Sequence, residues 1–332
     1  MKVLVTGGTG FLGRHVVWRL AAAGADVVFT GRRAGAAETV CALAPATVRW
    51  TFVDHGSKDA AETLTRCAAG ADAIVHCAAF AAPSGAAETF RRANVASTSE
   101  VLQACRDARV TRLVHVSTPS VYFDYRDRLK ISESEPLPRP VNDYARTKAA
   151  AEELVRQSDG SEAVILRPRA LFGPWDATLF PRLLRVIRRG AIPLMRGGRA
   201  MLDLTYVDNA VDGIWLALTR PLPRRIATYN LSNDEPIELS ALLVKISQHF
   251  SVRLRTVRLP WGFVAGVASL MEACGSALGK EPPLTRYGAG VLAFSQTLDL
   301  RAIKRDLGFR ARVSLDEGLS RYAAWLAAAG TP

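Results

Sequence analysis

The sequence predicts an α/β protein in which a doubly wound parallel sheet carries a smaller C-terminal substrate lobe. Three observations lead to this prediction. Runs of β-branched residues alternate with alanine-rich helical periods over the first two-thirds of the chain. A glycine-rich turn separates the first of these runs from the first helix. The chain has 332 residues, of which 49% are apolar and 22% charged, a composition typical of a folded globular protein.

Each element of the sheet follows from local sequence. The predicted strands cover residues 2–6, 26–30, 48–53, 73–77, 112–117 and 163–167, the last ended by Pro168. A helix over 11–23 stops at Gly24, and a helix over 144–157 is capped by Asn142 or Asp143. Right-handed crossovers would assemble these units into one doubly wound sheet.

The character of the sequence changes near Phe172, where prolines begin to break the chain into short elements. We therefore expect a nucleotide-binding domain with the catalytic residues over 1–171. A mainly substrate-binding lobe, interleaved with the first domain, is expected over 172–332. The segment 126–140 contains three prolines, and we expect it to be a mobile loop able to act as a lid.

Composition excludes several classes of protein. The five cysteines are widely spaced, with no CxxC pair or His/Cys cluster, so we expect neither a disulfide framework nor a metal site. The longest apolar run, 261–273, is short and contains Glu272, which argues against a membrane span. With no secretory signal pattern at the start, we expect a cytoplasmic protein. Basic residues are not interleaved with aromatic ones, so nucleic acid is not an expected partner.

The turn between the first strand and the first helix suits a dinucleotide pyrophosphate. Gly7 and Gly10 permit a tight turn and remove the Cβ atoms that would obstruct the ligand, and Gly13 allows close packing of helix on strand. The helix N-terminus adds amide donors and a favourable dipole. The residues of this turn that we expect at the cofactor are Gly7, Thr9, Gly10, Phe11, Leu12 and Gly13.

The second strand indicates which dinucleotide is bound. Enzymes that use NAD usually end this strand with an acid that binds the ribose hydroxyls, whereas an arginine favours a 2′-phosphate. Here the strand ends at Gly31, Arg32 and Arg33, and the two guanidiniums can pair with a phosphate. The sequence therefore predicts NADP(H) in preference to NAD(H). The alternative is a solvated basic turn, in a chain where 36 of the 43 basic residues are arginines.

A phenol and an ammonium group lie on one helix face at Tyr144 and Lys148, four residues apart. A nearby positive charge lowers the pKa of a phenol, which is about 10 when unperturbed, and so suits it to general acid/base work. Thr118 and Ser120 follow the fifth strand, at the sheet edge where ligands bind. A hydroxyl there can hold a substrate oxygen beside Tyr144. Taken alone, the Tyr/Lys pair could equally be an ordinary surface pair.

Together these motifs resemble the extended short-chain dehydrogenase/reductases over nearly the whole chain. The matching motifs are Gly7-x-x-Gly10-x-x-Gly13, His76-Cys77-Ala78-Ala79, Asn94-Val95, Val116-Ser117-Thr118, Tyr144-x-x-x-Lys148 and Leu166-Arg167-Pro168. Further motifs are similar to the 3β-hydroxysteroid dehydrogenase-like branch. They are Ser117 to Val121, Leu166 to Arg169, Thr205 to Asn209 and Glu281 to Arg286.

The resemblance implies a role for individual residues. Tyr144 would donate the proton, Lys148 would hold the nicotinamide ribose and lower the pKa of Tyr144, and Thr118 would replace the family's catalytic serine, with Ser117 and Ser120 as weaker candidates. Asp54 would contact the adenine, and Asn94 would order the site by bonding backbone. Three further residues are placed by the family beside the cofactor, namely Ala78 and Ala79 under the adenosine ribose and Pro168 at the nicotinamide.

The C-terminal half carries most of the net charge of +12. The first 180 residues hold 22 basic and 19 acidic residues, a net charge of only +3. A positive field there could attract an anionic substrate, a carrier protein or a membrane surface, or it could be a solvated arginine face. The apolar stretch 259–278 is either a buried helix or a wall for a long-chain or sterol-like substrate. Phe172, Trp175, Thr118 and Ser120 are the candidate substrate contacts.

The resulting expectation is an NADP(H)-dependent enzyme that interconverts a ketone and a secondary alcohol on a large hydrophobic substrate. The resemblance favours a 2-alkyl-3-oxoalkanoate or a 3β-hydroxysteroid-like compound, and it implies a homodimer. One alternative is a nucleotide-sugar epimerase or dehydratase with tightly bound NAD, although the missing acid at Gly31 departs from that group. A second alternative is a cofactor-binding sensor or assembly subunit without turnover. Contact with a membrane surface or a biosynthetic partner protein stays open.

Overall fold

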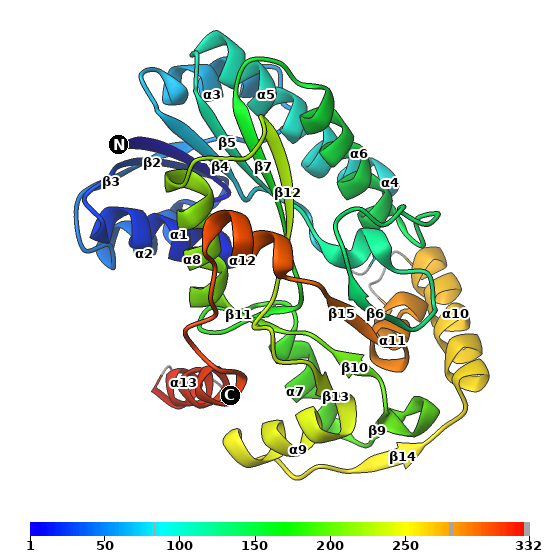
Figure 1. Cartoon of the computed structure of the whole chain (residues 1–332). Coiled ribbons are helices and arrows are strands. Elements are labelled where there is room, and N and C mark those ends of the chain that lie inside the picture. The colour runs from blue at the N-terminus through cyan, green and yellow to red at the C-terminus, as the bar shows by residue number, and fades with distance from the viewer. Residues whose placement is uncertain (83, 279–281, 329–332) are drawn as a thin grey trace.

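A seven-stranded parallel sheet forms the centre of the molecule (Figure 1). The computed structural model describes residues 1–82, 84–278 and 282–328. The strand order is β12-β7-β5-β4-β1-β2-β3, so the direction of winding reverses between β1 and β4, as in dinucleotide-binding sheets. This confirms the predicted doubly wound fold. The strands are β1 (Lys2–Thr6), β2 (Asp26–Gly31), β3 (Val48–Phe52), β4 (Ala73–His76), β5 (Arg112–Val116), β7 (Glu162–Pro168) and β12 (Ile226–Leu231).

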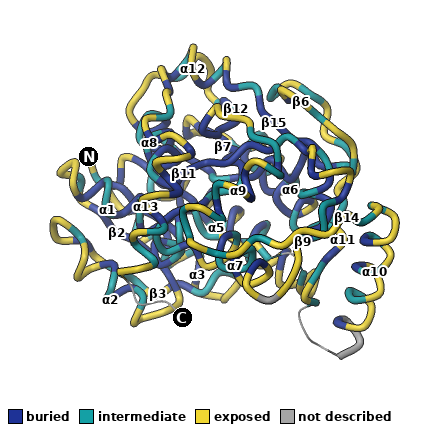
Figure 2. The backbone as a smooth tube through the Cα atoms, turned by 90° about the horizontal axis from the view of Figure 1, so that it is seen from below, coloured by how far each residue is buried: buried dark blue, intermediate teal, exposed yellow. Residues whose placement is uncertain are grey.

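Helices cover both faces of this sheet. One layer contains α1 (Phe11–Ala22), α2 (Ala34–Ala42) and α8 (Val207–Thr219), and the other contains α3 (Ala60–Ala68), α5 (Ser97–Asp107) and α6 (Asp143–Gln157). Because side chains alternate along a strand, Val3 and Val5 enter the first core and Leu4 the second. Figure 2 shows the resulting buried centre and the exposed outer turns.

The sheet gains one strand that the sequence analysis did not predict. β12 pairs in parallel with β7 over six residue pairs, from Ile226 opposite Ala163 to Leu231 opposite Pro168. It comes from the part of the chain beyond residue 172, where prolines obscure the alternation of strands and helices. The C-terminal half therefore contributes directly to the central sheet.

The remaining elements form a lobe at the carboxyl edge of the sheet (Figure 1). Its four-stranded sheet has the order β13 (Ile237–Glu238), β10 (Met201–Leu202), β15 (Gln296–Leu298), β6 (Arg128–Ile131). Two further pairs are β8 (Leu171–Phe172) with β11 (Thr205–Tyr206) and β9 (Ile192–Leu194) with β14 (Thr256–Arg258). The helices are α7 (Phe180–Arg189), α9 (Leu239–His249), α10 (Trp261–Leu278), α11 (Arg286–Ala293), α12 (Arg301–Leu307) and α13 (Leu315–Ala328). Within the described ranges, no helix combines the length and apolarity needed to cross a bilayer.

The segment 126–140 is anchored to the lobe, so the prediction of a mobile lid is wrong. Its strand β6 pairs with β15, and Asp127 forms an ion pair with Arg196 at 2.6 Å. The Glu133 carboxylate accepts a hydrogen bond from the backbone N–H of Asn230 at 2.7 Å. The prolines flank a strand whose partner is more than 160 residues away, which no local pattern could indicate.

A buried ion pair joins helix α6 to strand β7. The Glu152 carboxylate bonds the Arg167 guanidinium through N···O distances of 2.8 and 2.5 Å, and both side chains are at most 1% exposed. Arg167 also donates to the Tyr122 hydroxyl, and the Ser117 hydroxyl donates to Glu152 at 2.5 Å. The ends of β5 and β7 and the middle of α6 are thereby fixed to one carboxylate.

We expect Glu152→Gln to destabilise the fold by about 3 kcal/mol, because it leaves the buried Arg167 cation without its counter-charge. Glu153→Gln is the matched control on the same helix, since the Glu153 side chain is 55% exposed and its ion pair with Arg156 is a surface one. Denaturant unfolding of the three proteins measures the difference. Equal stability of the two variants would contradict this role for Glu152.

Candidate active site

The glycine turn leaves room for a pyrophosphate in the way the sequence predicts. Gly7 has φ +70°, and a Cβ there would lie 2.7 Å from the backbone of Ala78 on the neighbouring strand end. A Cβ on Gly13 would lie 2.2 Å from the Gly7 carbonyl oxygen, so the start of α1 packs directly on the turn. Arg14 secures the turn by donating to the carbonyls of Thr9 and Gly10.

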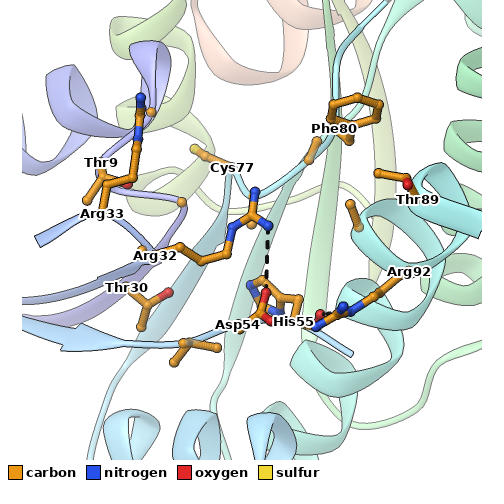
Figure 3. A pocket seen from close by; sticks show the side chains of 17 residues that line it. Thr9, Thr30, Arg32, Arg33, Asp54, His55, Cys77, Phe80, Thr89 and Arg92 are labelled. Carbon is orange, nitrogen blue, oxygen red and sulfur yellow. Dashed lines mark hydrogen bonds and ion pairs between the residues drawn. The ribbon is translucent and has the colours of Figure 1, made fainter. Parts of the chain in front are cut away.

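A cavity of about 600 Å³ opens from this turn along the carboxyl edge of β1, β2, β3 and β4 (Figure 3). Eight of the residues predicted at the cofactor line it, namely Gly7, Thr9, Gly10, Arg32, Arg33, Asp54, Ala78 and Ala79. The sequence analysis missed other lining residues, which are Thr30, Gly31, Val53, His55, Cys77, Phe80, Thr89, Arg92 and Ala93. The volume of the cavity, the glycine turn and the arginines Arg32 and Arg33 together fit a nicotinamide dinucleotide.

Six predicted cofactor residues lie outside the lining set, namely Phe11, Leu12, Gly13, Tyr144, Lys148 and Pro168. Phe11, Leu12 and Gly13 begin α1 just behind the glycine turn, and Leu12 is buried in the core. Pro168 ends β7 at the same sheet edge as the catalytic residues. Their roles at the cofactor stay predictions.

Arginines surround the carboxylate of Asp54. Arg92, on the π-helix η1 (Arg91–Ala96), bonds Asp54 at 2.5 Å and the His55 carbonyl at 2.6 Å. Arg32 approaches the other carboxylate oxygen at 3.7 Å, as Figure 3 shows. Arg32 is 70% exposed, so its guanidinium remains accessible to a second anion.

Position 31 has no space for a side chain. A Cβ on Gly31 would lie 2.3 Å from the Thr9 hydroxyl oxygen and 2.6 Å from its methyl carbon. An acid at the end of β2, as in NAD-type enzymes, would therefore displace a residue of the glycine turn. The crowding at Gly31 disfavours an acid at the end of β2, and the two arginines that follow it supply positive charge at the same place.

Tyr144 and Thr118 meet at the carboxyl edge of the sheet. Helix α6 begins where the Asn142 side chain accepts a hydrogen bond from the backbone N–H of Ala145 at 2.8 Å, which decides the cap in favour of Asn142. This places Tyr144 in the first turn, where its side chain lies beside that of Thr118. Thr118 is 7% exposed and begins the 3₁₀ turn η2 (Pro119–Tyr122).

Lys148 lies one turn further along α6 and is buried beneath Tyr144. Its side chain is 2% exposed, and Nζ donates to the Val116 carbonyl at 2.6 Å. Burial lowers the pKa of Lys148 to about 8, and the nearby Glu152 carboxylate opposes this shift. The ammonium group therefore lies close to its titration point near neutral pH.

The predicted lowering of the Tyr144 pKa is wrong for this structure. Burial raises the pKa of Tyr144 to about 12, and its hydrogen bond with Thr118 offsets only part of that shift. The Lys148 ammonium is engaged by the Val116 carbonyl instead. Tyr144 consequently stays protonated at neutral pH, which is the form that donates a proton to a reduced carbonyl oxygen.

Two other predicted residues support the site rather than line it. Asn94 accepts a hydrogen bond from the backbone N–H of Phe80 at 2.8 Å and donates to the Thr147 hydroxyl at 3.0 Å, which confirms that it bonds backbone to order the site. Ser117 is committed to Glu152, so its hydroxyl is not directed to a substrate.

A second tyrosine, which the sequence analysis missed, joins the hydroxyl groups after β5. Thr118 Oγ1 donates to Ser120 Oγ at 3.0 Å, and Ser120 Oγ lies 2.6 Å from the hydroxyl of Tyr287 on α11. Tyr287 directly follows the segment 281–286 of the family resemblance, of which Glu281 lies outside the described residues. The motif over 281–286 was the sequence signal that could have indicated Tyr287.

Phe172 and Trp175 do not face Tyr144. Phe172 is fully buried and stacks on Phe180 with ring centroids 5.1 Å apart, so the prediction that it lines a substrate pocket is wrong. Trp175 packs against Trp18 and receives the Arg14 guanidinium at 4.5 Å, and it thus supports the glycine turn. Phe172 therefore packs in the core, and Trp175 packs against α1.

Aromatic residues extend from Tyr287 toward α10. Phe123 contacts Tyr287 and Tyr125 with ring centroids 5.5 and 5.0 Å apart, and Trp261 contacts Phe294 at 5.1 Å. Helix α10 buries Val264 and Ala268 but leaves Phe263 and Leu270 at least 60% exposed, so it is only partly a buried helix. The surroundings of Tyr287 are apolar on this side.

A cavity that fits a dinucleotide, a Tyr/Lys pair in which Lys148 is buried and Tyr144 partly exposed, and a hydroxyl at the carboxyl end of β5 define an oxidoreductase of the extended short-chain dehydrogenase/reductase type. Residues 3–232 of the chain match the NAD dependent epimerase/dehydratase family. The chain belongs to this family.

Relatives of known name extend over the whole chain. A 4-hydroxy-2-methyl-3-oxo-4-farnesyl-3,4-dihydroquinoline-1-oxide ketoreductase of Stigmatella aurantiaca is 35% identical, covering 96% of this chain and 95% of the relative. A 2-alkyl-3-oxoalkanoate reductase of Shewanella oneidensis is 34% identical, covering 97% and 85%. A 3beta-hydroxysteroid-dehydrogenase/decarboxylase of Arabidopsis thaliana is 28% identical, covering 96% and 78%. These names agree with the predicted branch of the family.

Solved structures share the fold. MoeE5 in complex with UDP-glucose and NAD superposes with a TM-score of 0.75 at 25% identity, over 100% of both chains. The same architecture therefore serves reductases and a protein that binds a nucleotide sugar.

We expect Tyr144→Phe to lower turnover by about 100-fold or more, because it removes the proton donor. Binding of the cofactor should change little, since Tyr144 is not among the residues that line the dinucleotide cavity. Steady-state kinetics and a fluorescence titration with NADPH separate the two effects. Near-full turnover of this variant would contradict the assignment.

The pH profile of ketone reduction should be level at neutral pH and fall as pH rises through about 8. The pKa of Lys148 is lowered to about 8, so its ammonium loses a proton there, whereas the Tyr144 phenol, with a pKa of about 12, stays protonated. The measurement is kcat/KM for the ketone against pH at saturating cofactor. A profile that stays level well above that pH would show that Lys148 charge is not required.

Proposed function

We propose that this protein is an NADP(H)-dependent reductase of a ketone on a large hydrophobic substrate, and that it catalyses the reverse oxidation of the secondary alcohol less readily. The observation that carries the proposal is the proximity of the Tyr144 side chain, held as a neutral phenol, to the Thr118 hydroxyl at the carboxyl edge of the sheet. A neutral phenol next to a second hydroxyl suits an oxygen that gains negative charge as it is reduced.

In the proposed reaction the bound NADPH supplies the hydride. Thr118 and Tyr144 hold the carbonyl oxygen by hydrogen bonds, and Tyr144 transfers its proton to that oxygen. Lys148, which is buried, holds the nicotinamide ribose. The burial of these groups strengthens each of these interactions by excluding water.

The preference for NADP(H) rests on the end of β2. Arg32 and Arg33 line the cavity, and the crowding of Gly31 by Thr9 disfavours the acid that would bind NAD ribose hydroxyls. A 2′-phosphate dianion beside two guanidiniums gains charge-assisted hydrogen bonds that NAD cannot form.

A 2-alkyl-3-oxoalkanoate is the proposed substrate, with a 3β-hydroxysteroid-like compound as the alternative. The aromatic residues beside Tyr287 offer an apolar surface to an alkyl chain or a ring system. Relatives at 35 and 34% identity are named a ketoreductase of a farnesyl-bearing 3-oxo-dihydroquinoline-1-oxide and a 2-alkyl-3-oxoalkanoate reductase.

A second candidate is a nucleotide-sugar epimerase or dehydratase with tightly bound NAD. The likeness to MoeE5 bound to UDP-glucose and NAD favours it. The residues at the end of β2 oppose it, because NAD-type sugar enzymes usually place an acid where this chain has Gly31. A sensor without turnover is the third candidate, and the retained Tyr144 and Lys148 argue against it.

The experiment is reduction of NADP⁺, followed by absorbance, with a long-chain 2-alkyl-3-hydroxy acid. NAD⁺ and a 3β-hydroxysteroid are run in parallel. Turnover of the hydroxy acid with NADP⁺ supports the proposal in full, and turnover of the steroid alone replaces the substrate. Turnover of neither, together with NAD retained on purification, would favour the sugar enzymes.

We expect the double substitution Arg32→Gln and Arg33→Gln to raise KM for NADPH by about 10-fold or more while that for NADH changes little, since only NADPH carries the 2′-phosphate. Arg106→Gln, at an exposed arginine in the last turn of α5, controls for the loss of positive charge. Equal effects on both cofactors would contradict the proposed phosphate contact.

We propose a cytoplasmic protein, and the homodimer implied by the family resemblance stays a prediction. Contact with a membrane surface or a partner protein also stays a prediction.

A further inference from the structure

Arg169 is a buried cation that no structural role accounts for. It follows β7 directly, and its backbone is fixed on both sides, by donation to the Leu231 carbonyl at 2.9 Å and by acceptance from the Thr205 hydroxyl at 2.6 Å. The side chain is 8% exposed, and Nε has no hydrogen-bond partner among the described residues. A buried guanidinium with unpaired donors is unfavourable unless a ligand completes it.

Arg167, two residues earlier, shows what a structural arginine looks like in this fold. Its side chain is 1% exposed, and it bonds the Glu152 carboxylate and the Tyr122 hydroxyl. Arg169 has no such carboxylate. Burial lowers the pKa of Arg169 and the charge of the Asp203 carboxylate opposes this shift, but no ion pair joins the two side chains among the described residues. One oxygen of Asp203 accepts a hydrogen bond from the backbone N–H of Leu298.

The position of Arg169 connects it with the reacting centre. Burial raises the pKa of Tyr287, and the Arg169 guanidinium is near enough for its charge to oppose that shift. The Tyr287 hydroxyl is 2.6 Å from Ser120 Oγ. Ser120 in turn bonds Thr118, the partner of Tyr144. One row of hydroxyl groups thus leads from the proposed carbonyl site to an unpaired positive charge.

We propose that Arg169 binds the carboxylate of a 3-oxo acid while Tyr144 and Thr118 hold its ketone oxygen. This rests on the proposed ketone reduction and adds the residue that selects an anionic head group. In a 3-oxo acid a single carbon separates the ketone carbon from the carboxyl carbon, so the negative charge of the head group lies next to the oxygen that is reduced. A guanidinium matches a carboxylate with two parallel hydrogen bonds.

The test compares a 2-alkyl-3-hydroxy acid with its methyl ester, both oxidised with NADP⁺, because the two differ only in the charge that Arg169 would bind. We expect Arg169→Gln to lower kcat/KM for the acid by about 100-fold and that for the ester by less than about 3-fold. Arg169→Lys keeps the charge without the paired geometry and should recover part of the loss.

Two controls separate folding and general charge from recognition. NADPH binding by each variant, measured by fluorescence, reports an intact fold independently of turnover. Arg185→Gln removes an exposed arginine of α7 and should leave the ratio of acid to ester unchanged. Should Arg169→Gln fail to bind NADPH, Tyr287→Phe replaces it, with an expected loss of about 10-fold for the acid and a smaller one for the ester.

The outcomes distinguish the two proposals. Wild-type protein that oxidises neither compound nor a 3β-hydroxysteroid would overturn the proposed function itself. Wild-type protein that oxidises the ester as well as the acid, or a variant at Arg169 that loses both equally, would overturn the assignment of Arg169 and leave ketone reduction standing.

Discussion

The ion pair between Glu152 and Arg167 is the interaction on which the catalytic half depends. Glu152 lies one turn beyond Lys148 on α6, and the same carboxylate holds Ser117 at the end of β5. Tyr144 and Thr118 come from these two elements. Tyr144 and Thr118 therefore meet only if α6 keeps its position and orientation on the sheet. The buried Glu152 carboxylate, with its several hydrogen bonds, holds α6 in that position.

The two halves of the site obtain their chemistry from different physical sources. The dinucleotide cavity begins at a glycine turn whose backbone packs so closely on Ala78 and on the start of α1 that Gly7 and Gly13 leave no room for a Cβ. The catalytic centre is buried, and desolvation sets its protonation: it keeps the Tyr144 phenol neutral and brings the Lys148 ammonium near its titration point. Proton donation is thus prepared by exclusion of water, while cofactor binding is prepared by the shape of the main chain.

Local sequence predicted what depends on local structure. The six strands, the glycine turn, the Asn142 cap and the spacing of Tyr144 and Lys148 all lie within short segments. The elements that were missed depend on distant contacts: β6 is ordered by β15, β12 adds to β7, and Tyr287 reaches Ser120 across 167 residues. The lowered Tyr144 pKa was wrong for a related reason, because burial in the assembled fold, which a motif does not report, raises this pKa more than the Thr118 side chain lowers it.

The distribution of the site along the chain has a consequence for its synthesis. Every residue that lines the dinucleotide cavity lies before position 94, whereas the substrate side needs Tyr287 and the pairing of β6 with β15. A ribosome therefore releases all residues that line the cavity in the first third of translation and Tyr287 near the end. The loop that β6 and β15 close spans more than 160 residues, so their pairing becomes available only after nearly the whole chain has been made.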